Sequence, residues 1–232
     1  MSDLTVHYQI YLSGGGDEHQ SFPLDKFFFD KLPIGGQFLY IPVALRGHKL
    51  WSTASTWMTS VISLHERDDL KFEIWGDLLN KKREDLTGFS GIYIGGGNTW
   101  VLMKELKESG VDRLLMNYIT STGPVYGGSA GAIIFGKSID TSEDKNNIGW
   151  TDSKGLGLLG DYSIVCHFKT EQEEIYKDWA LKNKLPIICL PEETGLIAEH
   201  ETVKCVGSMS CVIYVADGGK FPLHPGEVFS LK

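Results

Sequence analysis

The chain has 232 residues, of which 42% are hydrophobic and 22% are charged, the balance of an ordinary globular protein that can bury a large core. Its formal net charge of −8 at pH 7, from 30 acidic and 22 basic side chains, excludes the basic surface that nucleic-acid phosphates require. Because no apolar stretch reaches the roughly 20 residues that cross a bilayer, and because no basic, cleavable leader is visible, we expect a cytoplasmic protein without a membrane or nucleic-acid partner.

Over the first two-thirds of the chain, apolar runs typical of strands alternate with helix-like segments. The expected strands are 6–12, 38–43, 71–75, 91–94 and 124–126. The expected helices are a segment through 27–29, then 51–65, 78–86, 99–108, 111–119 and a buried one that begins in 130–135.

The pattern changes after a glycine- and charge-rich loop at 138–160. Strands are expected at 162–166 and 186–190, with a helix at 171–182 between them, and short hairpin strands follow at 196–198, 203–206 and 211–215. Alternating strands and helices predict a three-layer α/β sandwich around a mainly parallel sheet, here with β-rich C-terminal hairpins. Since no linker interrupts the pattern, we expect a single domain over residues 1–232.

The stretch 127–132 reads Gly-Gly-Ser-Ala-Gly-Ala directly after an expected strand. Gly-x-Ser-x-Gly between a strand and a helix is typical of a nucleophile elbow, in which a strained turn exposes the serine hydroxyl above the sheet. Glycines flank the serine because side chains there would collide with the neighbouring strand and helix. The motif therefore predicts acyl-transfer chemistry at Ser129, with a plain glycine turn as the alternative.

Polar side chains also follow the next two expected strands, and functional groups in open α/β sheets collect at the carboxyl ends of strands. Ser129 needs a base, and His167 follows the strand 162–166 with an imidazole that can accept the hydroxyl proton and then pass it to the leaving amine. The alternative is a buried structural histidine. A carboxylate should orient the imidazole, and we favour Glu192 over Glu193 because it is nearer the strand end. Acids between the serine and the histidine match the order in α/β hydrolases and stay open as alternatives: Asp144, Asp152 and Asp161.

A second glycine-rich stretch, Gly-Gly-Gly-Asn-Thr at 95–99, also follows an expected strand. It lacks the lysine and the spacing of a phosphate-binding loop. An oxyanion hole is the better interpretation, because a glycine backbone can approach substrate closely and the amide of Gly97 could act with that of Ala130. A third such stretch, 13–17, is interpreted as a tight turn. No cysteine or histidine set has metal-site spacing, so we expect no metal and no cofactor.

With these residues in view, the chain resembles the peptidase E (aspartyl dipeptidase) family of serine peptidases. That family is related in fold to the cyanophycinases and to class I glutamine amidotransferases. The matching stretches are 94–99, 128–132, 167–168 and 190–192, and the resemblance covers roughly residues 6 to 215. It implies a Ser129–His167–Glu192 triad with Gly97 and Ala130 as the oxyanion hole. It also implies a small peptide substrate near Asn98 and Asp144, and a homodimer by family habit.

One departure concerns specificity. The aspartyl dipeptidases resembled here use an arginine downstream of the catalytic histidine to hold the substrate carboxylate, whereas this chain has no arginine after Arg113. Lys169 is the nearest replacement, although lysine is not equivalent to a bidentate arginine. We therefore expect a serine peptidase for small peptides, above all dipeptides, with Asp-X substrates in question. The alternatives are a cyanophycinase-like or isoaspartyl peptidase, and a catalytically silent binding protein on the same scaffold.

Overall fold

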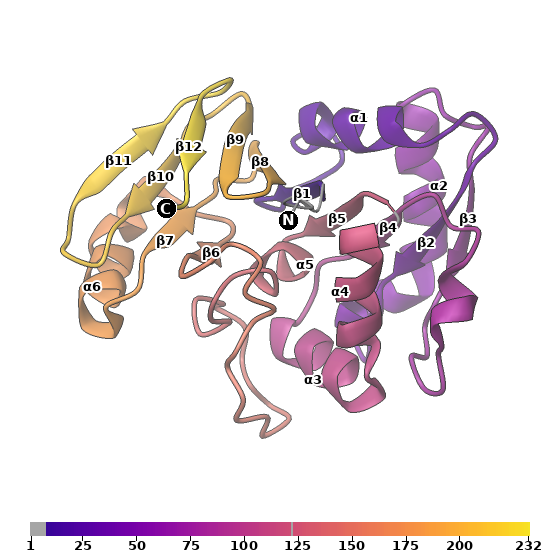
Figure 1. Ribbon diagram of the computed structural model, residues 1–232, viewed down its shortest axis with the longest axis horizontal. Coiled ribbons are helices and arrows are strands. Elements are labelled where there is room, and N and C mark those ends of the chain that lie inside the picture. Colours follow the sequence, from indigo (N-terminus) through magenta and orange to yellow (C-terminus); the bar gives the residue numbers. More distant parts are fainter. Residues whose placement is uncertain (1–7, 122) are drawn as a thin grey trace, which may run out of the picture.

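The expected three-layer α/β fold is confirmed by a computed structural model, which describes residues 8–121 and 123–232 (Figure 1). The larger of its sheets has eight strands in the order β12-β9-β8-β1-β5-β4-β2-β3. Its five parallel strands are β1 (Ile10–Ser13), β5 (Val125–Gly128), β4 (Ile92–Ile94), β2 (Gln37–Ile41) and β3 (Lys71–Ile74). The antiparallel strands β8 (Thr194–Glu199), β9 (Thr202–Gly207) and β12 (Val228–Ser230) extend it beyond β1.

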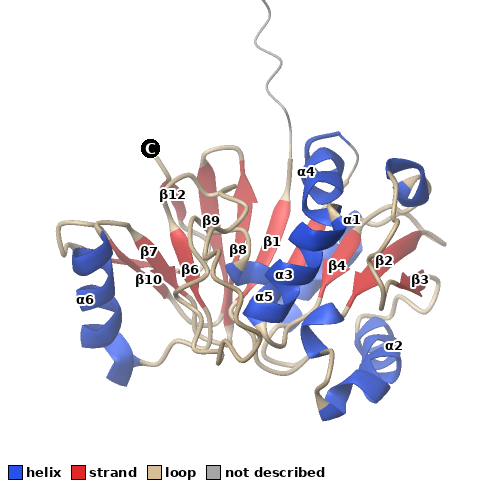
Figure 2. Ribbon diagram, turned by 90° about the horizontal axis from the view of Figure 1, so that it is seen from below, coloured by secondary structure: helices blue, strands red, loops and turns tan. Residues whose placement is uncertain are grey.

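Helices cover both faces of this sheet (Figures 1 and 2). The two faces differ in side chains because residues alternate along each strand. In β4, for example, Ile92 and Ile94 join one core cluster while Tyr93 joins the other. The first cluster is packed by α3 (Thr99–Ser109), α4 (Val111–Ser121) and α5 (Ala130–Ile133), and the second by α1 (Phe22–Lys31) and α2 (Ala54–Leu64), which continues the 3₁₀ turn η2 (Lys49–Thr53).

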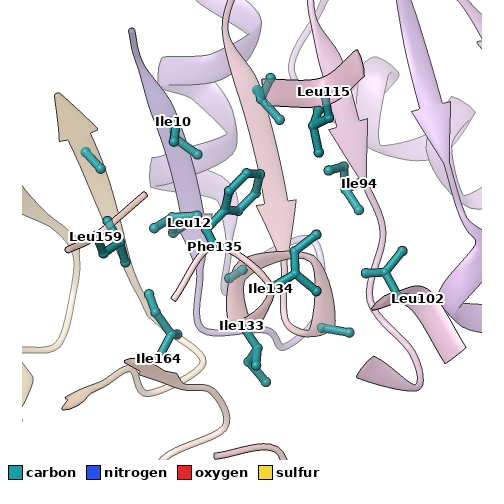
Figure 3. Packing of buried hydrophobic residues seen from close by; sticks show 14 of the residues in the cluster. Ile10, Leu12, Ile94, Leu102, Leu115, Ile133, Ile134, Phe135, Leu159 and Ile164 are labelled. Carbon is teal, nitrogen blue, oxygen red and sulfur yellow. The ribbon is translucent and has the colours of Figure 1, made fainter. Parts of the chain in front are cut away.

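The first core cluster holds α5 and the residues directly after it against the sheet. Ile134 and Phe135 are fully buried, and Figure 3 shows them among Leu12, Ile94 and Leu102 from neighbouring elements. Burying a side chain of this size contributes about 1.5–3 kcal/mol. The residue before α5, Ser129, is thereby attached to a rigid part of the core.

The first two strands after the serine do not continue the main sheet. β6 (Ser163–Val165) and β7 (Ile187–Cys189) pair in parallel within a separate four-stranded sheet, β11-β10-β7-β6, with β10 (Cys211–Tyr214) and β11 (Lys220–Leu223). The free edge of β1 is already occupied by antiparallel β8, so β6 cannot pair there. The helix after β6, α6 (Glu173–Asn183), follows a short 3₁₀ turn, η4 (Thr170–Gln172). The two sheets meet where the His167 amide donates to the Gly14 carbonyl at 2.8 Å.

Local predictions differ from the structure in three places. The helix expected over 78–86 is absent except for the 3₁₀ turn η3 (Arg83–Leu86), because Asn80 is left-handed at φ 60° and the Lys82 amide donates to the Asp85 side chain. The buried helix expected from 130 is a single turn, α5. The first strand begins at Ile10, and the part of that prediction over 6–7 lies outside the described residues. A short 3₁₀ turn, η1 (Val43–Leu45), follows β2.

Candidate active site

The turn between β5 and α5 has the backbone of a nucleophile elbow. Ser129 has φ 50° and ψ −111°, a sparsely populated conformation for a residue with a side chain. A Cβ at Gly127 would lie 2.2 Å from the Gly131 carbonyl oxygen, and one at Gly131 would lie 2.4 Å from the Ile94 carbonyl oxygen. Both glycines of the motif are therefore required by the close approach of the turn, the helix and β4.

Three side chains form a continuous hydrogen-bonded line at this turn. The Ser129 hydroxyl lies 2.7 Å from His167 Nε2, and His167 Nδ1 lies 2.8 Å from Glu192 Oε1. The imidazole can accept the serine proton on one nitrogen while donating its other N–H to the carboxylate. The side chains of His167 and Glu192 are partly exposed, which leaves the site open to solvent.

The backbone around His167 is also strained. His167 lies two residues beyond the end of β6 and has φ 56°, a left-handed conformation that is uncommon for a residue other than glycine. Its amide is held by the Gly14 carbonyl, and the next amide, that of Phe168, donates to the Leu190 carbonyl at 3.0 Å. These bonds connect the ends of β1, β6 and β7, which fixes the imidazole between the serine and Glu192.

The hydrogen bond from His167 is the main cause that holds the pKa of the Glu192 carboxyl below its ordinary value, and a hydrogen bond from Gln20 acts in the same direction. Glu192 is consequently ionised at neutral pH. A carboxylate in this state can stabilise an imidazolium that forms beside it.

The other acids considered from the sequence have different partners. Glu193 accepts from Gln20 at 3.1 Å, Asp152 pairs with Lys107 at 2.7 Å, and Asp161 pairs with Lys137 at 2.8 Å. Glu192 is the acid for which the structure records a hydrogen bond with His167.

The backbone amides of Gly97 and Ala130, beside the serine, have no recorded hydrogen-bond partner among residues 8–121 and 123–232, and neither does that of Gly96. The loop that carries Gly97 lies directly against the elbow, since a Cβ at Gly96 would be 3.2 Å from Ser129 Cβ. Gly97 itself has φ +135°, and a Cβ there would lie 2.4 Å from the Ala44 carbonyl oxygen. Only glycine therefore fits at position 97. The amides of Gly97 and Ala130 are both able to donate to a substrate oxygen.

The glycine stretch at 13–17, interpreted from the sequence as a tight turn, packs against the histidine and the glutamate. A Cβ at Gly15 would lie 2.2 Å from His167 Cε1, and one at Gly16 would lie 2.9 Å from Glu192 Cβ. Gln20, at the end of this loop, contacts Glu192 directly. Sequence reasoning missed this role, although a run of three glycines after a strand was an available signal.

Asn98 and Asp144 lie in the wall of a cavity of about 830 Å³ that contains Ser129. Asn98 caps α3, with its side-chain oxygen accepting from Val101 N at 3.0 Å and its amide donating to the Lys145 carbonyl at 3.1 Å. Asp144 Oδ2 accepts at 2.8 Å from the Thr99 amide, the Thr99 hydroxyl and the Ser142 hydroxyl. Both side chains thus hold the 142–148 loop against the start of α3.

Lys169 lies elsewhere. It lines a smaller cavity of about 290 Å³ that contacts His167 and Glu192 but not Ser129. Arg46, in the wall of the larger cavity, is engaged by Glu105 and by the Gly76 carbonyl, both at 2.6 Å. The structure therefore separates Lys169 from Asn98 and Asp144 by the imidazole.

No group of three or more His, Cys, Asp or Glu side chains within the described ranges is arranged to hold a metal ion. None of the helices found in these ranges has the length and apolar character needed to cross a bilayer.

Comparison with known proteins identifies the class. The model of Peptidase family S51 matches residues 10–206. A Drosophila melanogaster protein named probable alpha-aspartyl dipeptidase is 25% identical over 203 residues, covering 81% of this chain and 79% of the relative. Peptidase E of Shewanella denitrificans is 24% identical over 179 residues, covering 73% and 71% of the two chains. The crystal structure of a peptidase from an acI-B1 actinobacterium matches with a TM-score of 0.71 at 18% identity, covering 97% of this chain and 98% of the other.

The chain belongs to Peptidase family S51. It is a serine-type peptidase, and its resemblance to peptidase E is confirmed by the named relatives. The likeness to the actinobacterial structure confirms the α/β fold.

Proposed function

We propose that this peptidase hydrolyses small peptides, chiefly dipeptides, through a Ser129–His167–Glu192 triad. The observation that carries the proposal is the unbroken line of hydrogen bonds, 2.7 Å from Ser129 to His167 and 2.8 Å from His167 to Glu192. Ser129 Oγ attacks the peptide carbonyl carbon while His167 Nε2 takes its proton. The imidazolium then gives that proton to the leaving amine. A water molecule, deprotonated by His167 in the same way, attacks the acyl-enzyme and releases Ser129.

The amides of Gly97 and Ala130 serve in this proposal as the oxyanion hole. Each is free of a recorded partner among the described residues, and both flank Ser129. Such donors act on charge that develops only in the transition state, and losing one typically costs about 10²–10³ in kcat. Glu192, ionised at neutral pH, stabilises the imidazolium during the same step.

Substrate contacts are assigned by their place around the serine. Asp144 keeps one carboxylate oxygen, Oδ1, without a recorded bond in the described part of the chain, and it lines the cavity that contains Ser129, so we assign it to the substrate's ammonium group. Asn98 shapes the same wall. Lys169 borders the cavity beyond His167 and is our candidate for a substrate carboxylate, including that of an Asp-X peptide.

The test is hydrolysis of a dipeptide library by the wild type and by Ser129→Ala. We expect Ser129→Ala to fold normally and to lose several orders of magnitude in kcat, as other triad serines do. A fluorophosphonate should label the wild type stoichiometrically at Ser129. Wild-type hydrolysis by Ser129→Ala would refute the proposal, and an unlabelled, inactive wild type would favour a silent scaffold.

Substrate linkage needs a separate comparison. Rates on α- and β-linked aspartyl dipeptides distinguish the α-peptidase from an isoaspartyl peptidase, and Lys169→Ala tests the carboxylate contact. If Lys169 binds a substrate carboxylate, the variant should raise KM for acidic substrates more than for neutral ones.

A further inference from the structure

Both oxygens of the Glu192 carboxylate have a side-chain donor. Oε1 faces His167 Nδ1 at 2.8 Å, and Oε2 accepts from the Gln20 side-chain amide at 3.2 Å. A carboxylate held only through Oε1 can rotate about its last bond, whereas one held through both oxygens cannot. Gln20 therefore restricts the group that in turn orients the imidazole.

The Gln20 side chain is itself fixed. Its Oε1 accepts from the Asp17 amide at 2.9 Å, and its Nε2 donates to Glu193 Oε1 at 3.1 Å as well as to Glu192. The reverse orientation of this amide would place its oxygen against two carboxylates and its N–H groups against a backbone N–H. The turn below it is also held, since Asp17 Oδ1 accepts from the amides of His19 and Gln20 at 2.9 and 3.0 Å.

The glycine before this turn allows the close contact. Gly16 has φ +82°, and a Cβ there would lie 2.6 Å from Gln20 Oε1 and 2.9 Å from Glu192 Cβ. A larger residue would thus be forced between the amide and the glutamate. The loop at 13–20 brings a donor from the end of β1 to a carboxylate at the end of β7.

We propose that Gln20 is a positioning residue of the triad, which holds the Glu192 carboxylate oriented toward His167. The inference rests on the proposed function. Gln20 acts through the glutamate and contacts neither the serine nor the imidazole in the recorded bonds. Its loss should therefore lower kcat, leave KM nearly unchanged, and raise the pKa of Glu192.

The experiment compares wild type, Gln20→Met, Gln20→Glu and His19→Ala on one dipeptide substrate. Gln20→Met keeps the length of the side chain but removes its donors, and we expect kcat to fall about 10- to 100-fold with KM within about twofold. Gln20→Glu puts a third carboxylate beside Glu192 and Glu193, so its kcat should fall at least as far. His19→Ala, at an exposed neighbouring position, is the matched control and should retain wild-type kcat.

Two readouts separate positioning from general damage to the fold. In Gln20→Met the Glu192 carboxyl should titrate at higher pH than in the wild type, followed by carbon NMR of the labelled glutamate carboxyl, because it has lost a hydrogen-bond donor. The low-field proton resonance of the imidazole Nδ1–H, which reports its bond to Glu192, should shift or broaden in the same variant. Lower kcat with both readouts unchanged would overturn the inference, and so would a folded Gln20→Met with wild-type kcat. Ser129→Ala, measured alongside, is the test of the proposed function itself: if it is inactive while Gln20→Met is fully active, only the inference about Gln20 is wrong.

Discussion

Replacing Gly15 by alanine should displace the imidazole of His167 without substituting any titratable residue. The added methyl would lie 2.2 Å from His167 Cε1 and 2.8 Å from its Nε2. Non-bonded carbons come no closer than about 3.5 Å without strain, so the ring has to retreat by about 1.3 Å. The 2.7 Å hydrogen bond between Ser129 and His167 would then be stretched or broken.

A misplacement of about 1 Å at a catalytic group costs on the order of 10²-fold in rate. We therefore expect Gly15→Ala to lower kcat on a dipeptide by about 10²-fold, equivalent to about 2.7 kcal/mol in the barrier. Fluorophosphonate labelling of Ser129 should slow in parallel, since it needs the same proton transfer.

Backbone strain has to be separated from this steric effect. Gly15 has φ +108°, and Gly88 has φ +107° with no atom within 4 Å of the place that a methyl group would take. Gly88→Ala thus introduces about the same backbone strain, of order 1–3 kcal/mol in stability, at a site remote from the triad. Thermal denaturation should show that both variants are less stable than the wild type. In the dipeptide assay, kcat should be reduced in Gly15→Ala alone. Equal kcat in the two folded variants would refute the proposed packing of Gly15 against His167.

Two further predictions concern acid stability and thiol chemistry. A hydrogen bond from Arg67 is the main cause that lowers the pKa of Asp69 from 3.8 to about 2, so its stabilising effect is complete above pH 3.8 and is lost as pH falls through about 2. Asp69→Asn should therefore unfold at lower temperature than wild type near pH 7, with the difference vanishing near pH 2; a constant difference would contradict this. Burial raises the pKa of the Cys166 thiol, which lies 3.5 Å from the Ser129 carbonyl oxygen. Iodoacetamide at a pH of about 8, below the ordinary thiol pKa, should leave dipeptide hydrolysis intact, and inactivation proportional to Cys166 labelling would argue against a serine nucleophile.

Much of the site was predictable because its residues obey local rules. Gly127 and Gly131 mark the elbow in the sequence since only glycine permits the close backbone contacts that the structure contains. Ser129, His167 and Glu192 each follow an apolar run, and functional groups collect at the carboxyl ends of parallel strands. The single shared sheet edge that this rule implied is wrong, because β5 lies in the eight-stranded sheet and β6 and β7 lie in the other. Each of these patterns involves residues that are close together in the sequence, so the three site residues could be proposed without tertiary information.

The choice among acids was a different matter. Glu192 and Glu193 are adjacent in sequence, and the sequence favoured Glu192 only because it is nearer the strand end. In the structure Glu192 Oε1 lies 2.8 Å from His167 Nδ1, whereas the Glu193 carboxylate accepts from the Gln20 side chain. The two carboxylates point to different partners because the chain turns at these residues after β7. The prediction of a helix over 78–86 was wrong because Asn80 adopts a left-handed backbone and the Asp85 side chain accepts from the Lys82 amide.

What the sequence determined by itself was the alternation of strands and helices and the strained serine turn, since both depend on residues close together in the chain. What only the tertiary structure decided was the meeting of distant segments. Because β8 pairs with the edge of β1, β6 and β7 form part of a separate sheet. The glycines of the 13–17 loop pack against His167 and Glu192. The physical reason is that strand pairing and close packing between segments depend on which edges and faces remain unoccupied, and this is a property of the whole fold.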